Sequence, residues 1–493
     1  MTGLKIFNTL SGKKEDFQPL VAGKVSYYSC GPTVYDLSHL GHARKEMSHD
    51  VIQRYLRFIG YDVTYVRNIT DIDDKIINRA KELGIRPEQL ARRFTYTFWK
   101  DMDDLNNASP DVEPRATEYI SNMIRFTEEL IKKGHAYESS GDVYFDVPSF
   151  KEYGKLRKQS IEDLMHGARE QVRNQADLKE LKKNPVDFAL WKSAPTGETG
   201  WPSPWGWGRP GWHLECSCMI QNVLGETIDI HGGGEDLIFP HHENELAQSE
   251  ALHGKPLARF WIHNAFLMID AEKMAKSLGN FKTIQTILEN YSADTLRLFI
   301  LQTHYRSPID FNTEAIEAAK TGGQRLLRAA RMAKTDELHK ENGKLNSKLG
   351  KFLTADHPCV LSLRNDPDAG AAISKLHNDF VEAMNNDFNT PQAVSALFNM
   401  ADLVFATKDE NLASKYAAAI KTYAMVLGLR LTDTSKIIDN STGSKLVEAL
   451  LDLRDHARSN KDYKQSDQIR DALLGLGIKV MDVKGSRASW EKE

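Results

Sequence analysis

The sequence predicts an α/β fold that is followed by a helix bundle and a small C-terminal domain. Residues 25–29 are rich in β-formers and run into a Cys-Gly-Pro turn, a helical pattern covers 41–57, and a second strand pattern covers 62–69. Strand, glycine turn, helix and strand at this spacing form a βαβ unit. Strand patterning returns at 227–231, whereas from about residue 313 onward the pattern is helical with few strand signals.

Length and composition restrict the class of protein. The chain has 493 residues, 41% of them hydrophobic and 27% charged, which suits about three domains with sizeable cores. A net charge of −4 excludes a protein held on nucleic acid by bulk charge, but not one with a local RNA-binding face. No apolar run is long enough for a membrane span, and none near the N-terminus predicts a secretory signal. The four cysteines lack a disulfide-like pattern, so we expect a cytoplasmic protein in a reducing compartment.

The segment between the two strand regions divides into three parts. Residues 85–140 are predicted to be helical, with an amphipathic stretch from Ala116 to Lys133. Residues 155–190 are charged and poor in aromatics, which predicts an exposed insertion. The stretch Trp191–Trp212 is rich in Pro, Gly and Trp, which predicts an irregular segment. A further helix is expected after Pro240.

A polar segment, Thr432–Ser444, separates the helix bundle from a compact tail. The bundle is expected to end near Leu431. In the tail we expect one helix or a helix pair over 446–476 and a short strand over 478–480. The predicted domains are 1–312 with an insertion at about 110–205, then 313–434 and 435–493.

Two short motifs suit polyphosphate chemistry. His39-Leu40-Gly41-His42 opens the first helix, and free N–H groups at a helix N-terminus attract anions. Taken alone, the two histidines could simply cap the helix. Lys273-Met274-Ala275-Lys276-Ser277 places two lysines in a loop that ends in glycine, where mobile charges could hold a leaving polyphosphate. Taken alone, this stretch is a solvated basic loop.

A third group of residues has the chemistry of a metal site. His241 and Glu245 are spaced to share one helix face, Cys30 ends a strand, and Cys216 and Cys218 lie between them in the chain. Two thiolates, an imidazole and a carboxylate suit tetrahedral zinc, and four unrelated core residues are the alternative. The residue types alone do not choose between Cys216 and Cys218, or between His241 and His242.

The glycine run after His231 lies at a predicted strand end, where ligands bind in open α/β sheets. Adenine or ribose could lie on the backbone of His231 and Gly233, with Asp236 near the ribose. A plain glycine turn is the alternative.

Together the His39–His42 and Lys273–Ser277 motifs resemble the paired signature of class I aminoacyl-tRNA synthetases. Several further blocks resemble the cysteinyl-tRNA synthetase family: Tyr28–Asp36, Asn68–Lys75, Gly211–Ser217, His231–Leu237 and Phe239–Glu245. The resemblance covers the chain from about Leu4 onward and is weakest in 155–185 and 335–370. It implies a Rossmann-type class I catalytic domain with an insertion, an α-helical bundle and a small C-terminal anticodon-binding domain. One departure is Ala275, where the family's KMSKS loop usually has serine.

The resemblance also implies a reaction and its site residues. L-cysteine would be joined to tRNA(Cys) through cysteinyl-adenylate, with ATP and Mg²⁺, and the 2′-hydroxyl of the tRNA would attack. The implied catalytic residues are His39, His42, Lys273 and Lys276, and Gly41, His231, Gly233, Asp236 and Lys276 would bind ATP. One zinc per chain would be held by Cys30, Cys216, His241 and Glu245 and would select the substrate thiol. We expect Glu245 to be the ligand that gives up its coordination position to the substrate. Cys30, Gly31, Thr70 and Trp212 would contact cysteine, although core packing is an equal alternative for Trp212.

In this family the tail reads the anticodon GCA. The implied anticodon-binding residues are Arg458, Tyr463, Asp467 and Asp482, with tyrosine at 463 where many members have tryptophan. Stacking and base-edge hydrogen bonds, not bulk charge, would carry such recognition. A solvated helix face is the alternative for any single lysine here.

Two rival functions stay open. A paralogous cysteine–amino-sugar ligase would share the catalytic core and the zinc, but would not need the tail. A non-catalytic, zinc-dependent RNA-binding protein would not need the intact histidines and lysines. We expect a monomer more than a dimer, and no membrane partner.

Overall fold

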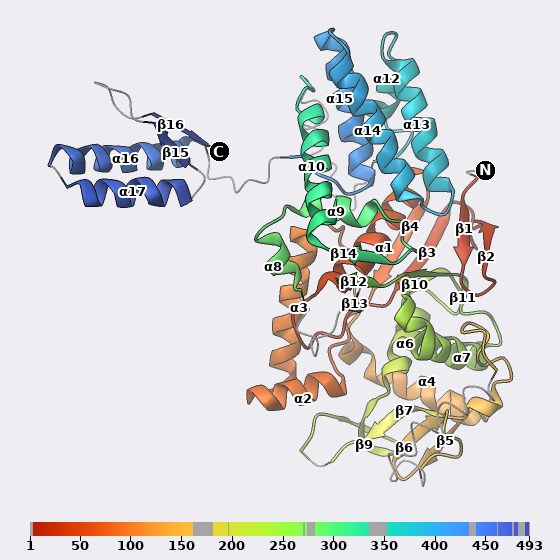
Figure 1. Cartoon of the computed structure of the whole chain (residues 1–493). Coiled ribbons are helices and arrows are strands. Elements are labelled where there is room, and N and C mark those ends of the chain that lie inside the picture. The colour runs from red at the N-terminus through yellow and green to blue at the C-terminus, as the bar shows by residue number, and fades with distance from the viewer. Residues whose placement is uncertain are drawn as a thin grey trace. The chain divides into compact units, whose positions relative to one another are not determined.

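The computed structural model describes residues 3–160, 181–195, 197–269, 272–273, 282–334, 353–432, 440–460, 462–475, 478–481 and 489–492. The chain forms two compact units, Met1–Leu431 and Thr432–Glu493. Figure 1 follows the chain from the red N-terminal strands to the blue C-terminal helices.

A four-stranded parallel sheet forms the centre of the first unit, in the order β11-β10-β3-β4. Its strands are β3 (Lys24–Ser29), β4 (Asp62–Arg67), β10 (Ile228–Gly234) and β11 (Ala258–Asn264). Helix α1 (Leu40–Phe58) connects β3 to β4, which confirms the predicted βαβ unit. Successive strand residues point to opposite faces. Tyr27 therefore packs with α1, and Tyr28 packs with α6 (Trp212–Val223) and α7 (Glu243–His253).

The glycines after His231 continue strand β10, whereas the sequence pattern ends the strand before them. A Cβ on Gly232 would lie 2.6 Å from Cε1 of His49, and one on Gly233 would lie 2.7 Å from Cε1 of His242. Two histidine rings thus pack directly on the strand backbone. Glycine is needed here for space and not for a turn.

Only part of the stretch 85–140 is helical. Helix α2 (Asp74–Leu83) precedes this stretch, and the α-helices within it are α3 (Pro87–Asp104) and α4 (Ile120–Lys132). Residues 105–115 run beside the central sheet instead, where Val112 pairs with Val66 and Arg115 with Ile69. Pro110 and Pro114 remove backbone donors and prevent a helix there, which the periodicity alone missed.

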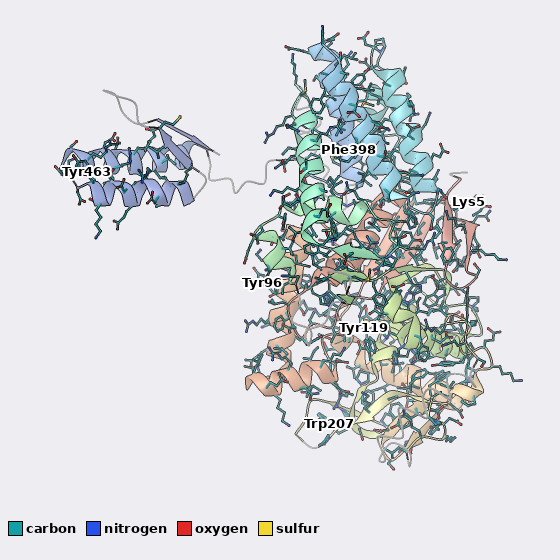
Figure 2. The ribbon with its side chains drawn as sticks, viewed as in Figure 1. Lys5, Tyr96, Tyr119, Trp207, Phe398 and Tyr463 are labelled. Carbon is teal, nitrogen blue, oxygen red and sulfur yellow. The ribbon has the colours of Figure 1, made fainter. Side chains whose placement is uncertain are left out.

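The prediction of an irregular segment over 191–212 was wrong, because these residues complete an antiparallel sheet. The sheet has the order β5-β6-β7-β9-β8, with β5 (Ala136–Ser139), β6 (Asp142–Phe145), β7 (Phe188–Ser193), β8 (Trp201–Ser203) and β9 (Gly206–Pro210). A Cβ on Gly208 would lie 2.3 Å from the Lys192 carbonyl oxygen, so glycine permits the close β7–β9 pairing. Pro202 is tolerated because β8 is an edge strand. Trp191 is buried in this region's core, whereas Trp207 faces outward (Figure 2). Residues 161–180 of the expected insertion lie outside the described residues.

The remaining strands of the first unit are short. A hairpin, β1 (Lys5–Asn8) and β2 (Lys13–Asp16), begins the described chain. A three-stranded sheet joins β13 (Glu272–Lys273), β12 (Leu267–Ile269) and β14 (Ile309–Phe311). Helices α8 (Ile284–Leu288) and α9 (Ala293–Leu301) lie between β13 and β14 in the chain.

The predicted helix bundle follows β14. Its helices among the described residues are α10 (Thr313–Ala330), α12 (Pro358–Arg364), α13 (Gly370–Asn385), α14 (Thr390–Ala406) and α15 (Glu410–Val426). Its apolar residues form one continuous core with α1 and the central sheet, and this core includes Tyr27, Phe380 and Tyr423. No helix among the described residues has the length and apolar character needed to cross a bilayer.

The second unit is a helix pair with a small sheet. Helices α16 (Asn440–Ser459) and α17 (Tyr463–Gly475) pack through Leu451 and Leu473. Strand β15 (Ile478–Met481) pairs with β16 (Ser489–Lys492), so Val480 lies opposite Trp490.

Candidate active site

The His39-Leu40-Gly41-His42 motif forms the N-terminus of α1. His39 is the N-cap residue and its Nδ1 accepts the Gly41 N–H at 3.0 Å, while Nδ1 of His42 accepts the His39 N–H at 3.2 Å. The histidines therefore do cap the helix. Because both Nδ1 atoms accept, each neutral imidazole carries its proton on Nε2, from which it can donate to an anion. Capping therefore uses Nδ1 and would leave anion binding to Nε2 of the same rings.

A cavity of about 360 Å³ opens at the carboxyl ends of the parallel strands. Its wall includes Cys30 after β3, Gly234 at the end of β10 and Asn264 at the end of β11. Seven residues predicted from the sequence line it: Cys30, Gly31, His39, Gly41, His42, Trp212 and Asp236. The cavity therefore joins the helix N-terminus to the predicted thiol site.

Four potential metal ligands meet beside this cavity. The ligand atoms of Cys30, Cys216, His241 and Glu245 all lie within 4.8 Å of one another, and the four residues are buried. The Sγ atoms of Cys30 and Cys216 are 3.7 Å apart, and Nε2 of His241 lies 2.9 Å from Oε1 of Glu245. The Trp212 ring stacks on the His241 ring, with centroids 4.2 Å apart. Trp212 therefore links the cavity wall to the cluster.

The electrostatics of this cluster favour charged donors. Burial alone would raise the pKa of the Cys216 thiol, but its hydrogen bonds with Cys30 and His241 bring the pKa down to about 6. Burial lowers the pKa of His241, yet the Glu245 charge overcomes this and raises it to about 10. The pKa of Glu245 lies well below its usual range because His231 and His241 outweigh the effect of burial. A buried thiolate and carboxylate beside a protonated imidazole form a pattern in which a divalent cation would replace the imidazole proton, because a metal-ligating histidine is neutral.

The structure brings a second set of donors to the same place. Cys30, His231, His242 and Glu245 also satisfy the 4.8 Å criterion. Nε2 of His231 lies 2.8 Å from Oε2 of Glu245, and Nε2 of His242 lies 3.3 Å from Sγ of Cys30. Cys218 belongs to neither set, and burial raises its pKa to about 12. The geometry thus removes one open choice, between the two cysteines, and keeps the other, between the two histidines.

Three predicted contact residues do not reach the cavity wall. His231 and Gly233 are fully buried in β10, where His231 contacts Glu245. Thr70 is also buried, and its Oγ1 donates to Oε2 of Glu215 at 2.9 Å. These residues shape the layer beneath the site.

Two residues near the site were missed by the sequence reasoning. His213 contacts the His241 ring, with their Nδ1 atoms 2.9 Å apart, and Lys45 lines the cavity. His213 directly follows Trp212, and Lys45 lies one helical turn after Gly41. Adjacency and helical spacing are the signals that could have identified them.

Other predicted residues fall partly outside the described chain. The backbone of Lys273 pairs in β13, whereas Lys276 and Asp482 lie outside the described residues. In the second unit, Arg458 is in the last turn of α16, and Tyr463 and Asp467 are one turn apart on α17. Tyr463 is 62% exposed (Figure 2), and Asp467 pairs with Arg470 at 3.3 Å. These three side chains are accessible to a ligand.

Three family models match successive parts of the chain. The "tRNA synthetases class I (C) catalytic domain" matches residues 16–321, the "DALR domain" 379–432 and the "Cysteinyl-tRNA ligase anticodon binding domain" 443–490.

Curated relatives match over nearly the whole length. "Cysteine--tRNA ligase" of Heliobacterium modesticaldum is 45% identical over 99% of both chains. The protein of the same name from Geobacter sulfurreducens is 44% identical over 97% of this chain and 98% of its own.

Solved class I synthetases share the fold at low sequence identity. Mycobacterium tuberculosis methionyl-tRNA synthetase, in complex with methionyl-adenylate, has a TM-score of 0.52 at 16% identity and covers 87% of this chain and 94% of its own. The LeuRS in a ternary complex from Agrobacterium radiobacter K84 has a TM-score of 0.55 at 12% identity and covers 84% and 86%. With the parallel sheet, the capped histidine motif and the thiol cluster in place, these matches show that the chain belongs to the cysteine–tRNA ligase family of class I aminoacyl-tRNA synthetases.

Proposed function

We propose that the protein joins L-cysteine to tRNA(Cys) at the expense of ATP, which yields AMP and diphosphate. The observation that carries this proposal is the single cavity that connects the His39–His42 helix N-terminus to Cys30 and Trp212. Nucleotide phosphates and a thiol side chain would meet there. The full-length similarity to curated cysteine–tRNA ligases supports the same activity.

In the first step the cysteine carboxylate attacks the α-phosphorus of ATP. The Nε2–H groups of His39 and His42 stabilise the charge that develops on the phosphate oxygens. Lys276, assisted by Lys273, would hold the leaving pyrophosphate, whose charge Mg²⁺ would screen, and Asp236 would bind the ribose. In the second step the 2′-hydroxyl of the tRNA attacks the adenylate. Positioning and charge stabilisation suffice, because neither histidine has to act as an acid or base.

One zinc ion fits the donor set Cys30, Cys216, His241 and Glu245. Two sulfurs, one imidazole and one carboxylate within 4.8 Å match tetrahedral zinc, and the lowered pKa of Cys216 favours its thiolate. When bound, zinc supplies a soft Lewis acid that favours a substrate thiolate over the hydroxyl of serine. Trp212 and Gly31 line the cavity, and Thr70 lies in the buried layer beneath it. This chemistry provides discrimination of ~10⁴ or more that an apolar pocket lacks.

The second unit is proposed to read the anticodon of tRNA(Cys). Exposed Tyr463 would stack on a base, while Arg458, Asp467 and Asp482 would contact base edges or the backbone. The match of residues 443–490 to an anticodon-binding family supports this and argues against an amino-sugar ligase. We also propose that the protein acts in the cytoplasm as a monomer.

The test is exchange of pyrophosphate into ATP with cysteine or serine, on protein whose zinc has been counted. We expect cysteine-dependent exchange at one zinc per chain and little exchange with serine. Transfer of cysteine to tRNA(Cys), and not to an amino sugar, would complete the assignment. A zinc-loaded protein without exchange would instead be a binding paralogue, or an enzyme whose loop has lost its function through Ala275.

A further inference from the structure

A buried charged pair lies in the wall of the active-site cavity. Lys45 and Glu46 are 9% and 3% exposed, and Nζ of Lys45 lies 2.9 Å from Oε1 of Glu46. Both residues line the cavity together with Cys30 and His42. Lysine is rarely buried, and a buried ion pair is weak evidence of stabilisation because desolvation offsets its attraction. A lysine at this place therefore needs a functional explanation.

Glu46 has a second cation as its partner. Nη1 of Arg67 donates to Oε2 of Glu46 at 3.0 Å, and Arg67 also pairs with Glu113. Burial raises the pKa of Glu46, but Lys45 and Arg67 together bring it down to about 2. Loss of the Lys45 charge thus leaves the carboxylate paired with Arg67.

The Lys45 ammonium has more N–H donors than it uses among the described residues. An ammonium group carries three N–H donors, and within the described part of the chain Lys45 makes one hydrogen bond, to Glu46. Lys45 lies four residues after Gly41 and three after His42, which puts all three on one face of α1. Its ammonium is therefore a nearly buried cation next to the phosphate-binding end of the cavity.

We propose that Lys45 binds an anionic oxygen of the reacting groups, either the carboxylate of the amino acid or the α-phosphate of ATP. This inference rests on the proposed function. In that reaction a carboxylate oxygen forms a bond to the α-phosphorus, the bond to the bridging oxygen of the β-phosphate breaks, and pyrophosphate leaves with the electron pair. No proton is transferred. A fixed ammonium between the two anions reduces their repulsion as they approach.

The test compares cysteine with cysteamine, which lacks the carboxylate. Both are titrated by calorimetry into the zinc-loaded full chain, as wild type, Lys45→Met and Lys45→Arg. If Lys45 binds the carboxylate, cysteine loses about ten- to hundredfold in affinity in Lys45→Met while cysteamine does not, and Lys45→Arg recovers part of the loss. If Lys45 binds the α-phosphate, both affinities stay unchanged and the KM for ATP in pyrophosphate exchange rises by a similar factor.

Three controls make the result decisive. Lys81→Met removes an exposed lysine from α2 and is expected to change neither affinity nor KM. Zinc content and melting temperature report on folding, and Lys45→Gln, which keeps a donor for Glu46, replaces Lys45→Met if that variant is unstable. Unchanged cysteine affinity together with unchanged exchange kinetics in the Lys45 variants overturns the proposal. A wild type that binds cysteine without exchange overturns the proposed function instead, and the cysteine–cysteamine comparison still tests Lys45.

Discussion

At the scale of single residues, Cys30 and Glu245 belong to both possible donor sets, so the other two members decide the metal site. Cys216 and His241 add a sulfur and a nitrogen, whereas His231 and His242 add two nitrogens. The first set also contains Cys216, whose pKa is lowered by hydrogen bonds although burial alone would raise it. These contacts favour the set with two cysteines.

Cysteine substitutions test this assignment. Cys216→Ala is expected to lose zinc and cysteine-dependent exchange, because one of four ligands is missing. Cys218→Ala removes a buried thiol from the same helix outside the cluster and is expected to keep both. Metal analysis and pyrophosphate exchange measure the two effects. Equal losses in the two variants would contradict the ligand set.

Buried His49 makes stability depend on pH. Burial lowers its pKa from the ordinary value of 6.5 to about 3, and the Lys45 charge adds to this effect. The unfolded chain therefore binds more protons than the folded one between these values. Neutral His49 therefore costs no stability above pH ~6.5. Below that pH the free energy of unfolding falls by about 1.4 kcal/mol per pH unit, until the folded protein also binds the proton.

Urea unfolding at pH 7, 6 and 5 checks this prediction. His49→Gln is expected to show a shallower loss of the free energy of unfolding than wild type. His456→Gln, an exposed substitution in the second unit, serves as the control. Identical slopes for wild type and His49→Gln would show that His49 is not the titrating group.

At the scale of elements, the site depends on two loops that follow neighbouring strands. Gly31 after β3 and Asn68 after β4 touch closely: the Gly31 N–H donates to Oδ1 of Asn68 at 2.7 Å. A Cβ on Gly31 would lie 1.6 Å from the Asn68 carbonyl oxygen. Any larger residue there must push the loops apart and move Cys30.

Gly31→Ala is therefore expected to reduce zinc content and to lower exchange by about a hundredfold, the effect of a misplacement of roughly 1 Å. Gly323→Ala in α10 is the matched control, since its nearest neighbour is Leu298 Cδ2 at 3.8 Å. That variant should be more stable by about 0.5–1 kcal/mol, because alanine favours a helix. Melting curves and metal analysis separate the two outcomes.

Particular residues show what the sequence was able to predict. Strong periodicity identified the βαβ unit and the bundle, and helical spacing paired His241 with Glu245. The pattern failed at 191–212, because the glycines that suggested a loop serve close strand pairing, as Gly208 does. His231 and Gly233, which were expected to offer their backbone to the nucleotide, are buried in β10, since a sequence pattern does not reveal which face of the strand is covered by α7. Neither the choice between His241 and His242 nor the place of Lys45 follows from spacing, because both depend on distances across the fold.

At the scale of the whole molecule, catalysis and anticodon reading are assigned to different units. Asp467→Ala is expected to weaken charging of tRNA(Cys) and to leave pyrophosphate exchange intact, because the side chain is exposed in the second unit. Asp452→Ala on α16 is the control for loss of one charge from the same unit. KM for tRNA and the exchange rate are measured on each. A fall in both activities for Asp467→Ala would make the residue structural.

Arg297 has a consequence for dissecting this enzyme. Its buried guanidinium binds Asp50 of α1 at 2.8 Å, the Leu105 carbonyl at 3.0 Å and the Leu427 carbonyl at 3.2 Å. A protein that ends near residue 312 would lack the Leu427 carbonyl that this cation binds. It would also expose the apolar residues of the central sheet and α1 that pack against the bundle. A minimal cysteine-activating fragment should therefore end near Leu431, and attempts to express the nucleotide-binding half alone should yield aggregates.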